Sequence, residues 1–503
     1  MLPAQTPRHN SLQSDLSAAV VVFLVAVPLC LGIALASGTP LFAGIISGVV
    51  GGLIVGAVSG SPLGVSGPAA GLAVVVLSSV QSLGSYEAFL LAVVLAGMVQ
   101  IVLGLARAGA ITLYFPSSVI RGLLAAIGLI IILKQITHAL GYAPSADDGL
   151  LTWTEKLSPA TTSIAVLSIL ILVMWDRPFI KARPISKLVQ GPLVVVLAGI
   201  GLSRLLHGGS AYVLRDEQLV AIPNAHSIAE FMAQFQHPDL SALNRPEVYI
   251  VALTLAVIAS LETLLCVDAT DKLDPLKRAT PPNRELVAQG IGNVVSGAIG
   301  GLPVTQVIVR SSANIQAGGR TKLATIMHGV LLLICVLAIP DVLNRVPLAS
   351  LAAILIVVGF KLAHPSLFGA MYRKGWHQFI PFLTTVAAIL ATDLLRGIAL
   401  GLLTAVCASI ARTRLATGAL RWRALVPAGP QSWKVAPYIH FYHKAQFQRL
   451  FDSVQAGTPV SLDVTACQIM DPDIRDLVDS FELHAPSEGK QLIIHGMTES
   501  IFT

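Results

Sequence analysis

Long apolar runs, separated by short polar segments, repeat along most of this chain. A helix that crosses a bilayer needs ~20 predominantly apolar residues, and by hydropathy and length the chain holds about fourteen such segments when two short ones are included. Runs at or near spanning length include Leu16–Ser37, Phe89–Leu105, Val119–Leu133, Val248–Leu265 and Phe379–Thr392. The pattern predicts an all-α polytopic membrane protein.

The same pattern divides the chain into three regions. Residues 1–15 form a polar tail, residues 16–415 a transmembrane domain, and residues 430–503 a region of different composition. The transmembrane domain separates into halves at 16–206 and 248–415, and about fourteen segments divided equally give seven in each half. Because seven is odd, the second half must be inverted relative to the first, which predicts 7+7 inverted repeats.

The C-terminal region alternates between strand-like and helical patterns. Strands are predicted at Tyr438–Tyr442, Val460–Val464 and Gln491–His495, and helices at Lys444–Ala456 and Asp473–Phe481. These elements predict a small α/β domain, which we expect on the cytoplasmic side of the membrane.

Two glycine–proline breaks interrupt apolar runs at corresponding places in the two halves. The first is Ser66–Gly71 and the second is Gly300–Gln306, and each precedes an apolar stretch too short to span a bilayer. Paired broken segments of this kind indicate the binding site of a transporter. A half-helix that begins inside the membrane presents unpaired N–H groups and about half a positive charge. Two such ends that face each other predict a site for a small anion.

The residues at these breaks are the candidate substrate-binding residues. We expect Ala69, Ala70 and Gly71 to begin the first short helix, where their small side chains leave backbone N–H groups open to a ligand. Tight helix packing also explains small residues at these positions, and both explanations can hold together. The candidates in the second half are Val304, Thr305, Gln306 and Arg310.

Arg310 lies in an apolar stretch and shares a helical face with Gln306 and Asn314, because the three are spaced by four residues. An arginine within a membrane is costly unless it faces a protein cavity or a partner. We therefore expect Arg310 to add positive potential behind the half-helix end. The alternative is that Arg310 lies near the cytoplasmic end, close to Arg320, and extends its side chain to water.

Glu262 is the only charged residue in the run Val248–Leu265. A carboxylate inside a membrane segment indicates a functional site by default. It is a candidate proton carrier, a candidate cation ligand, or an ion-pair partner of Arg310. Cys266 lies one turn further on, and we expect it to face the same cavity. A static Glu262–Arg310 pair is the purely structural alternative.

Composition and charge agree with the membrane assignment. The 503 residues are 54% hydrophobic and 12% charged, whereas soluble domains are about 25% charged. The net charge of +6 does not indicate nucleic acid, because basic residues gather in alternate loops such as 177–187 and 272–284. With a cytoplasmic N-terminus these loops lie inside and the more acidic loops 143–159 and 210–247 lie outside, as the positive-inside rule requires. We expect both termini in the cytoplasm.

The sequence carries no motif of an enzyme or of an ATP-driven pump. It contains no Walker sequence. The five cysteines form no CxxC pair, and we interpret them as small core residues rather than as a disulfide framework or a metal cluster. We expect no cofactor other than the candidate cation at Glu262.

Several motifs resemble those of the SulP family of anion transporters, the bacterial relatives of the animal solute carrier 26 family. The most specific are Asn283–Leu286, Gln289 with Gly290, Asn293, Gly300–Thr305 and Gly318–Thr321, and the segments Asp15–Pro28 and Phe115–Gly122 are also similar. The resemblance implies 7+7 inverted repeats arranged as a core and a gate domain, a substrate site between the third and tenth helices, and a homodimer in the inner membrane.

The resemblance also bears on coupling and substrate. It implies that Glu262 matches a carboxylate that binds sodium in cyanobacterial bicarbonate transporters, but Cys266 replaces the hydroxyl residue one turn later, so proton coupling is an alternative. Leu29 stands where family members often carry glutamine. The segment 28–38 is similar to a bacterial branch sometimes fused to carbonic anhydrase, which suggests bicarbonate.

The C-terminal region resembles a shortened STAS domain, the usual cytoplasmic module of the family. Segment 462–471 is similar to its central strand and loop. Pro472 occupies the position of a phosphorylated serine in anti-sigma-factor antagonists, so we expect no phosphorylation switch there.

These observations predict secondary active transport of a small inorganic anion by an elevator-type mechanism. Bicarbonate coupled to sodium or protons is the first choice, and a sulfate or dicarboxylate proton symporter is the second. An uncoupled anion channel would be recognised by single-channel currents. A nucleobase permease shares the architecture, but the SulP-like segment 283–305 argues against it.

Overall fold

The chain forms two compact units. Unit 1 comprises Met1–Gly109 with Ile127–Leu362, and unit 2 comprises Ala110–Ala126 with Ala363–Thr503. The computed structural model describes residues 8–141, 158–183, 189–205, 214–223, 228–415, 424–429, 431–454, 457, 459–485 and 489–496. The acidic loops predicted to lie outside the membrane fall partly outside these ranges, as does most of the polar N-terminal tail.

The described part of the first half supplies seven helical segments, and the third of them is the short α4 (Ala70–Leu83) that follows the first break. The second segment is continuous and contains a π-helical turn. The segments are α1 (Arg8–Ala36), α2 (Leu41–Val50) with η1 (Gly51–Val55) and α3 (Gly56–Val58), α4, α5 (Tyr86–Leu105), α6 (Ser117–Leu140), α8 (Pro159–Trp175) and α11 (Gly191–Leu205).

The described part of the second half repeats this arrangement, and its third segment is again short: α15 (Ile308–Gln316) has 9 residues. The others are α13 (Pro246–Leu273), α14 (Pro282–Ala298), α16 (Leu323–Ala338), α18 (Leu348–Leu362), α20 (Trp376–Ala391) and α21 (Leu394–Leu415). Short connecting helices are α9 (Pro178–Lys181), α12 (Ile228–Ala233), α17 (Pro340–Leu343) and α19 (Pro365–Arg373). The predicted polytopic helical fold, with a broken third segment in each half, is confirmed.

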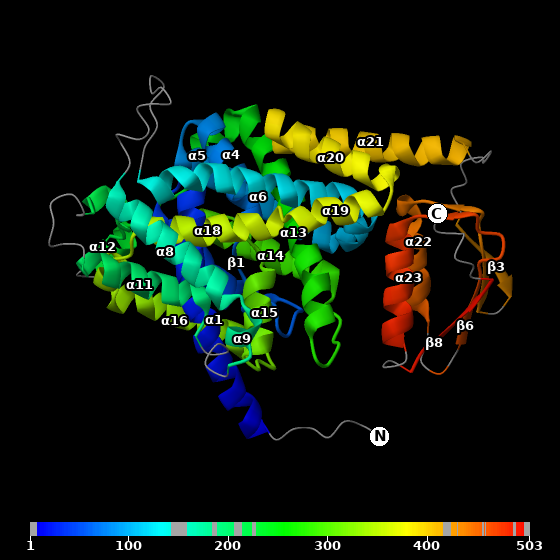
Figure 1. Cartoon of the computed structure of the whole chain (residues 1–503), viewed down its shortest axis with the longest axis horizontal. Helices are drawn as coiled ribbons and strands as arrows, with labels where there is room; N and C mark the ends of the chain where they lie inside the picture. Colours follow the sequence, from blue (N-terminus) through cyan, green and yellow to red (C-terminus); the bar gives the residue numbers. More distant parts are fainter. Residues whose placement is uncertain are drawn as a thin grey trace. The chain divides into compact units, whose positions relative to one another are not determined.

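In each half, the first segment packs on the third and fourth segments of the other half. The first segment of the first half, α1, packs on α15 and α16, which are the third and fourth segments of the second half (Figure 1). The first segment of the second half, α13, packs on α4 and α5, which are the third and fourth segments of the first half. Inverted repeats that interlock around a common site produce this exchange.

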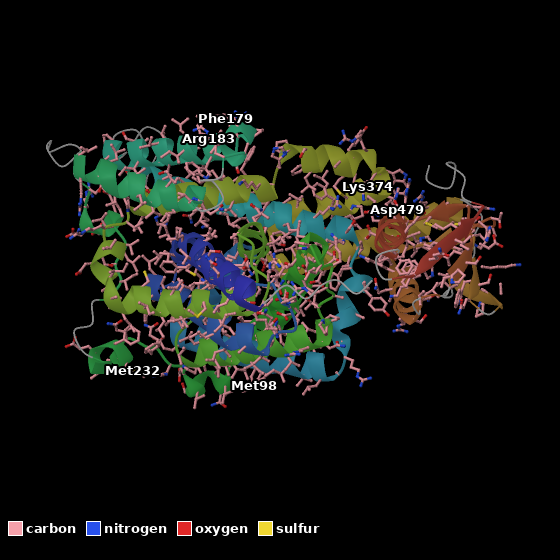
Figure 2. The ribbon with its side chains drawn as sticks, turned by 90° about the horizontal axis from the view of Figure 1, so that it is seen from below. Met98, Phe179, Arg183, Met232, Lys374 and Asp479 are labelled. Carbon is pink, nitrogen blue, oxygen red and sulfur yellow. The ribbon has the colours of Figure 1, made fainter. Side chains whose placement is uncertain are left out.

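Exposed apolar side chains cover the outside of the helices in unit 1. Met98 on α5 is 49% exposed and lies at the outer edge of the unit (Figure 2), and Leu105 at the end of the same helix is 72% exposed. Large apolar surfaces of this kind are rare on soluble monomers, but they suit contact with lipid chains. The protein is therefore a multi-pass membrane protein.

The C-terminal domain in unit 2 is a small α/β structure. Its sheet has the order β3-β4-β6-β8, formed by Leu425–Gly429, Ser432–Val435, Pro459–Asp463 and Gln491–His495. The pair β3–β4 is antiparallel, and the pairs β4–β6 and β6–β8 are parallel. Figure 1 shows α22 (Lys444–Ser453) and α23 (Pro472–His484) side by side on one face of this sheet. The core between them contains Phe447, Leu462 and Ile474. The predicted α/β domain is confirmed.

Two details of this domain differ from the sequence prediction. The strand predicted at Tyr438–Tyr442 ends at Ile439, as β5, which pairs with β7 (Ile469–Met470). A 3₁₀ turn replaces the rest of it, because the His440 N–H donates to the His443 ring at 3.0 Å and folds the backbone back. Strand β3 begins at Leu425, five residues before the expected domain start at 430.

Carboxylates at the start of α23 hold this domain to helix ends within unit 2. Asp473 accepts hydrogen bonds from the Ser117 N–H at 2.7 Å and the Ser117 hydroxyl at 2.5 Å, so it supplies an acceptor to the first residue of α6. The buried Asp471 accepts a hydrogen bond from Gln378 of α20 at 3.3 Å. Lys374 pairs with Asp476 of α23 at 2.9 Å.

We expect this attachment to weaken as the pH rises. Burial, followed by the charge of Asp473, raises the pKa of Asp471 to about 7, although Arg412 and Lys374 act in the opposite direction. An exposed aspartate titrates near ~3.9, so the attached state takes up a proton. The attachment is therefore strongest below pH ~4 and is weakened progressively as the pH rises to ~7.

Hydrogen exchange of the first turns of α6 and α23, compared at about pH 5 and about pH 8, will measure this change. Asp471→Asn should remove the pH dependence. Asp479→Asn is the matched control, because its side chain lies on the same helix and is half exposed. An unchanged pH dependence in Asp471→Asn would show that another group is responsible.

Candidate functional site

The two breaks meet inside unit 1 as a short pair of antiparallel strands. The first break forms β1 (Ser66–Pro68), the second forms β2 (Val304–Gln306), and Gly67 lies opposite Thr305. All six residues are buried. Strand pairing satisfies backbone groups that a broken helix would otherwise leave unpaired in apolar surroundings. We call this strand pair the crossing.

Buried polar side chains on one face of α14 hold the crossing. Asn293 accepts a hydrogen bond from the Val304 N–H at 2.5 Å and donates to the Val304 carbonyl at 3.1 Å. Gln289 donates to the Ser66 hydroxyl at 2.7 Å and to Glu285 at 2.8 Å. Because residues four apart share a helical face, α14 contacts both strands at once.

Helix α4 begins where the sequence predicts. Ala69 is its extended N-cap, with φ −114° and ψ 138°, and Ala70 and Gly71 are its first residues. Gly71 also allows a close approach from α13: an added Cβ would lie 2.6 Å from Glu262 Oε1. The start of α4 is thus formed by small residues and faces a carboxylate.

The prediction that Gln306 shares a helical face with Arg310 is wrong, because Val304–Gln306 are not helical. These residues form β2, and α15 begins only at Ile308, after the N-cap Val307. Val304 and Thr305 are β-branched and favour extended backbone, and both backbone polar groups of Val304 are bound by Asn293. Gln306 lies on a strand rather than on the helical face of Arg310, and its amide donates to Thr270 of α13 at 3.1 Å.

Arg310 lies on α15 and is completely buried, which excludes the alternative that its side chain extends to water. Its Nη2 donates to the Pro68 carbonyl at 3.3 Å and to Cys30 Sγ of α1 at 3.4 Å. Its Nε and Nη1 have no hydrogen-bond partner. The guanidinium therefore lies beside the strand that leads into α4, and it retains free donors.

Two residues on α13 approach the two half-helix starts. The Gly71 N–H of α4 is directed at the Glu262 carboxylate, whose Oε2 is buried without a partner. The Ile308 N–H of α15 is directed at the Cys266 thiol. No ion pair among the described residues joins Glu262 to Arg310. The static pair considered from the sequence is therefore absent from this part of the chain, and both charged groups flank the start of α4 separately.

Gly67→Ala is expected to lower anion affinity about tenfold or more, because charge-assisted hydrogen bonds contribute ~1.5–3 kcal/mol each. A Cβ on Gly67 would lie 2.0 Å from Arg310 Nη1, so the guanidinium would have to move. Gly201→Ala on α11 is the control, since a Cβ there meets nothing within 4 Å. Anion competition in an uptake assay will measure the affinity, and equal values for the two variants would contradict the assigned position of Arg310.

Sequence reasoning missed three residues of this site. Cys30 was interpreted as a small core residue, yet it accepts a hydrogen bond from Arg310. Asn293 entered only as part of a family motif, although its spacing from Gln289 and Glu285 indicates a polar helix face. His328, which lies within electrostatic range of Arg310, is fully buried on α16, and its isolated position in an apolar run was the available sign.

Residues 12–384 match the sulfate permease family. Over 412 residues the chain is 28% identical to YvdB of Bacillus subtilis, described as a candidate sulfate transporter, and covers 75% of it with 80% of its own length. It is 25% identical over 390 residues to the bicarbonate transporter BicA of a Picosynechococcus species, with 74% of this chain and 64% of that protein covered.

Solved structures agree with these relatives. The transmembrane domain of a cyanobacterial bicarbonate transporter BicA superposes with a TM-score of 0.64 at 26% identity, and the match covers 80% of this chain and 98% of that domain. The anion transporter Slc26a9 from mouse superposes with a TM-score of 0.68 at 16% identity over 100% of this chain and 88% of that one, which shows a common fold including the C-terminal domain. The chain belongs to the sulfate permease family of anion transporters.

Proposed function

We propose that this protein is a secondary active transporter of bicarbonate, coupled to sodium or protons. The observation that carries the proposal is the crossing: two half-helices begin at its two ends, and each start is approached by a residue of α13. The positive ends of two helices and the buried Arg310 favour a bound anion. The proposed substrate-binding residues are Ala69, Ala70, Gly71, Val304, Thr305, Gln306 and Arg310.

Glu262 gives this site a means of coupling. Its carboxylate lies at the Gly71 N–H, where it competes with an external anion for the start of α4. A proton or a cation on Glu262 removes the repulsion between the two negative groups. Anion affinity should therefore rise as the concentration of the coupling ion rises, and each ligand should strengthen binding of the other.

The choice between sodium and protons depends on the groups around Glu262. Its Oε2 is a free, buried carboxylate oxygen, which suits either ion. Cys266, one turn further along α13, contributes a thiol, and sulfur is a poor ligand for hard cations such as sodium. A thiol at this position therefore favours protons as the coupling ion, with the Glu262 carboxylate as the group that carries the proton.

Sulfate is the second candidate substrate. It is supported by the relative YvdB, whose description names sulfate, whereas the two matches to BicA name bicarbonate. Both anions suit a site built from helix starts and an arginine, because such a site recognises negative charge and oxygen acceptors.

We further propose an inner-membrane location with both termini in the cytoplasm, a homodimer, and an elevator-type motion. The distribution of basic loops supports the orientation. The crossing supports the motion, because the hydrogen bonds between β1, β2 and α14 join the two half-helices into one body that can carry the site.

Uptake of radiolabelled bicarbonate into proteoliposomes tests the proposal. The full-length protein is measured with and without an inward sodium gradient at fixed pH, and then with an inward proton gradient without sodium. Uptake stimulated by either gradient supports a bicarbonate symporter and identifies the coupling ion. Sulfate uptake without bicarbonate uptake would replace the substrate, and uptake that ignores both gradients would exclude coupling.

A further inference from the structure

We propose that His328 is an additional substrate-binding residue that recognises the O–H group of a hydrogen oxyanion bound to Arg310. This inference rests on the proposed function and deepens it, because it selects bicarbonate over anions that carry no proton. It is argued from the unsatisfied polar atoms that surround Arg310, from the close packing of α16, and from the hydrogen-bonding chemistry of the imidazole ring.

The guanidinium of Arg310 has donors available for a ligand. It is completely buried, and its Nη2 is the group bonded to Pro68 and Cys30. Nε and Nη1 are buried without partners, and no carboxylate among the described residues forms an ion pair with it. A buried charge is stable only when it is paired or hydrogen-bonded. An oxyanion that accepts hydrogen bonds from Nε and Nη1 supplies both the opposite charge and the missing hydrogen-bond partners.

His328 has the same unsatisfied character in the same region. Its side chain is completely buried, and neither Nδ1 nor Nε2 has a hydrogen-bond partner. It lies within electrostatic range of Arg310. Buried polar atoms without partners are uncommon in folded proteins, and here they occur on two side chains that interact electrostatically with each other.

Close helix packing brings His328 into this region. At the residue after His328, a Cβ added to Gly52 of η1 would lie 2.5 Å from the Gly329 Cα, so α16 and the π-helical turn touch through glycines. Helix α16 also packs on α1, which carries Cys30. A Cβ added to Gly48 of α2 would lie 2.7 Å from Cys30 Sγ and 2.9 Å from Leu332 Cδ1, so the turn of α16 after His328 packs close to the thiol that accepts a hydrogen bond from Arg310.

The chemistry of the ring then selects the ligand. A second positive charge beside the buried Arg310 is unfavourable, so the imidazole is neutral and offers one N–H donor and one acceptor nitrogen. Bicarbonate presents acceptor oxygens to Arg310 and an O–H donor to the acceptor nitrogen. Sulfate is fully ionised at neutral pH and nitrate carries no proton, so both leave that nitrogen unsatisfied, at the cost that an unpaired buried group imposes.

Nitrate is the matched probe, because it shares the planar shape and single charge of bicarbonate but lacks the O–H. Two quantities are measured in proteoliposomes that contain wild type, His328→Phe or His328→Gln. The first is the half-saturation constant for bicarbonate uptake, and the second is the nitrate concentration that inhibits this uptake by half. We expect wild type to bind bicarbonate about tenfold or more tighter than nitrate. In His328→Phe the bicarbonate affinity should fall about tenfold while nitrate affinity changes little. Glutamine retains a donor and an acceptor and should restore most of the preference.

Preserved nitrate inhibition in His328→Phe shows that the site is still folded. If His328→Phe does not yield folded protein, His328→Ala and His328→Gln are compared in the same way. An unchanged ratio of bicarbonate to nitrate affinity, or a wild type without the preference, overturns the role of His328 while leaving bicarbonate transport intact. Sulfate uptake in the absence of bicarbonate uptake overturns both proposals.

Discussion

Glu262→Gln should transport bicarbonate without regard to the coupling ion. Glutamine has nearly the same shape as glutamate but carries no charge, so the Gly71 N–H keeps a neighbour while the competing negative charge disappears. Anion affinity should become independent of pH and sodium. At alkaline pH the variant should bind the anion more tightly than wild type does, by about tenfold or more. A tenfold change in affinity corresponds to ~1.4 kcal/mol of binding free energy. Accumulation against a gradient should be lost, because nothing then carries the driving ion.

The measurement compares equilibrium exchange with concentrative uptake in proteoliposomes at several pH values. Glu247→Gln is the matched control: Glu247 lies in the first turn of the same helix and is exposed. The control should retain full coupling. A Glu262→Gln variant that still accumulates bicarbonate with wild-type ion dependence would mean that the carboxylate has only a structural role.

Arg310→Lys should lower anion affinity about a hundredfold, through the loss of charge-assisted hydrogen bonds worth ~1.5–3 kcal/mol each. The planar fork of arginine reaches Pro68 and Cys30 through Nη2 and leaves Nε and Nη1 for a ligand. The ammonium group of lysine is compact and cannot make both sets of contacts, so the positive charge is retained but the geometry is lost. The half-saturation for uptake should rise more than the maximal rate falls.

Arg345→Lys provides the control, since Arg345 is exposed in the turn that follows α17 and the same chemical change there should have no effect. Size-exclusion chromatography of both variants in detergent separates loss of binding from loss of folding. A wild-type half-saturation constant in folded Arg310→Lys would exclude the guanidinium from the anion site.

The helices and the broken segments could be predicted because each depends on local sequence. Apolar length defines the spans, and the glycine–proline pairs at Gly67–Pro68 and Gly301–Pro303 mark where helix cannot continue. Ala69, Ala70 and Gly71 were assigned to the start of α4 for the same reason. The small α/β domain followed from the alternating pattern of its strands and helices.

The crossing could not be predicted, because it depends on residues far apart in the chain. Val304 adopts strand conformation because its N–H donates to Asn293 of α14 and because it pairs with Pro68 of the first half. The position of Arg310 is likewise set by Gly67 and Cys30, which belong to the first half. Helical spacing alone placed Gln306 on the face of Arg310, and only the three-dimensional contacts turn its side chain toward Thr270.

The antiparallel crossing also sets the distance between the starts of α4 and α15. Helix α4 leaves the strand pair beyond Pro68, at the Val304 end, and α15 leaves it beyond Gln306, at the Ser66 end. The separation of the two helix starts is therefore set by the length of three paired residues, at ~3.4 Å each, rather than by any side chain. Substitutions can change charge, hydrogen bonding and side-chain volume at this site, but the spacing of the two helix starts changes only with an insertion or deletion in the strands.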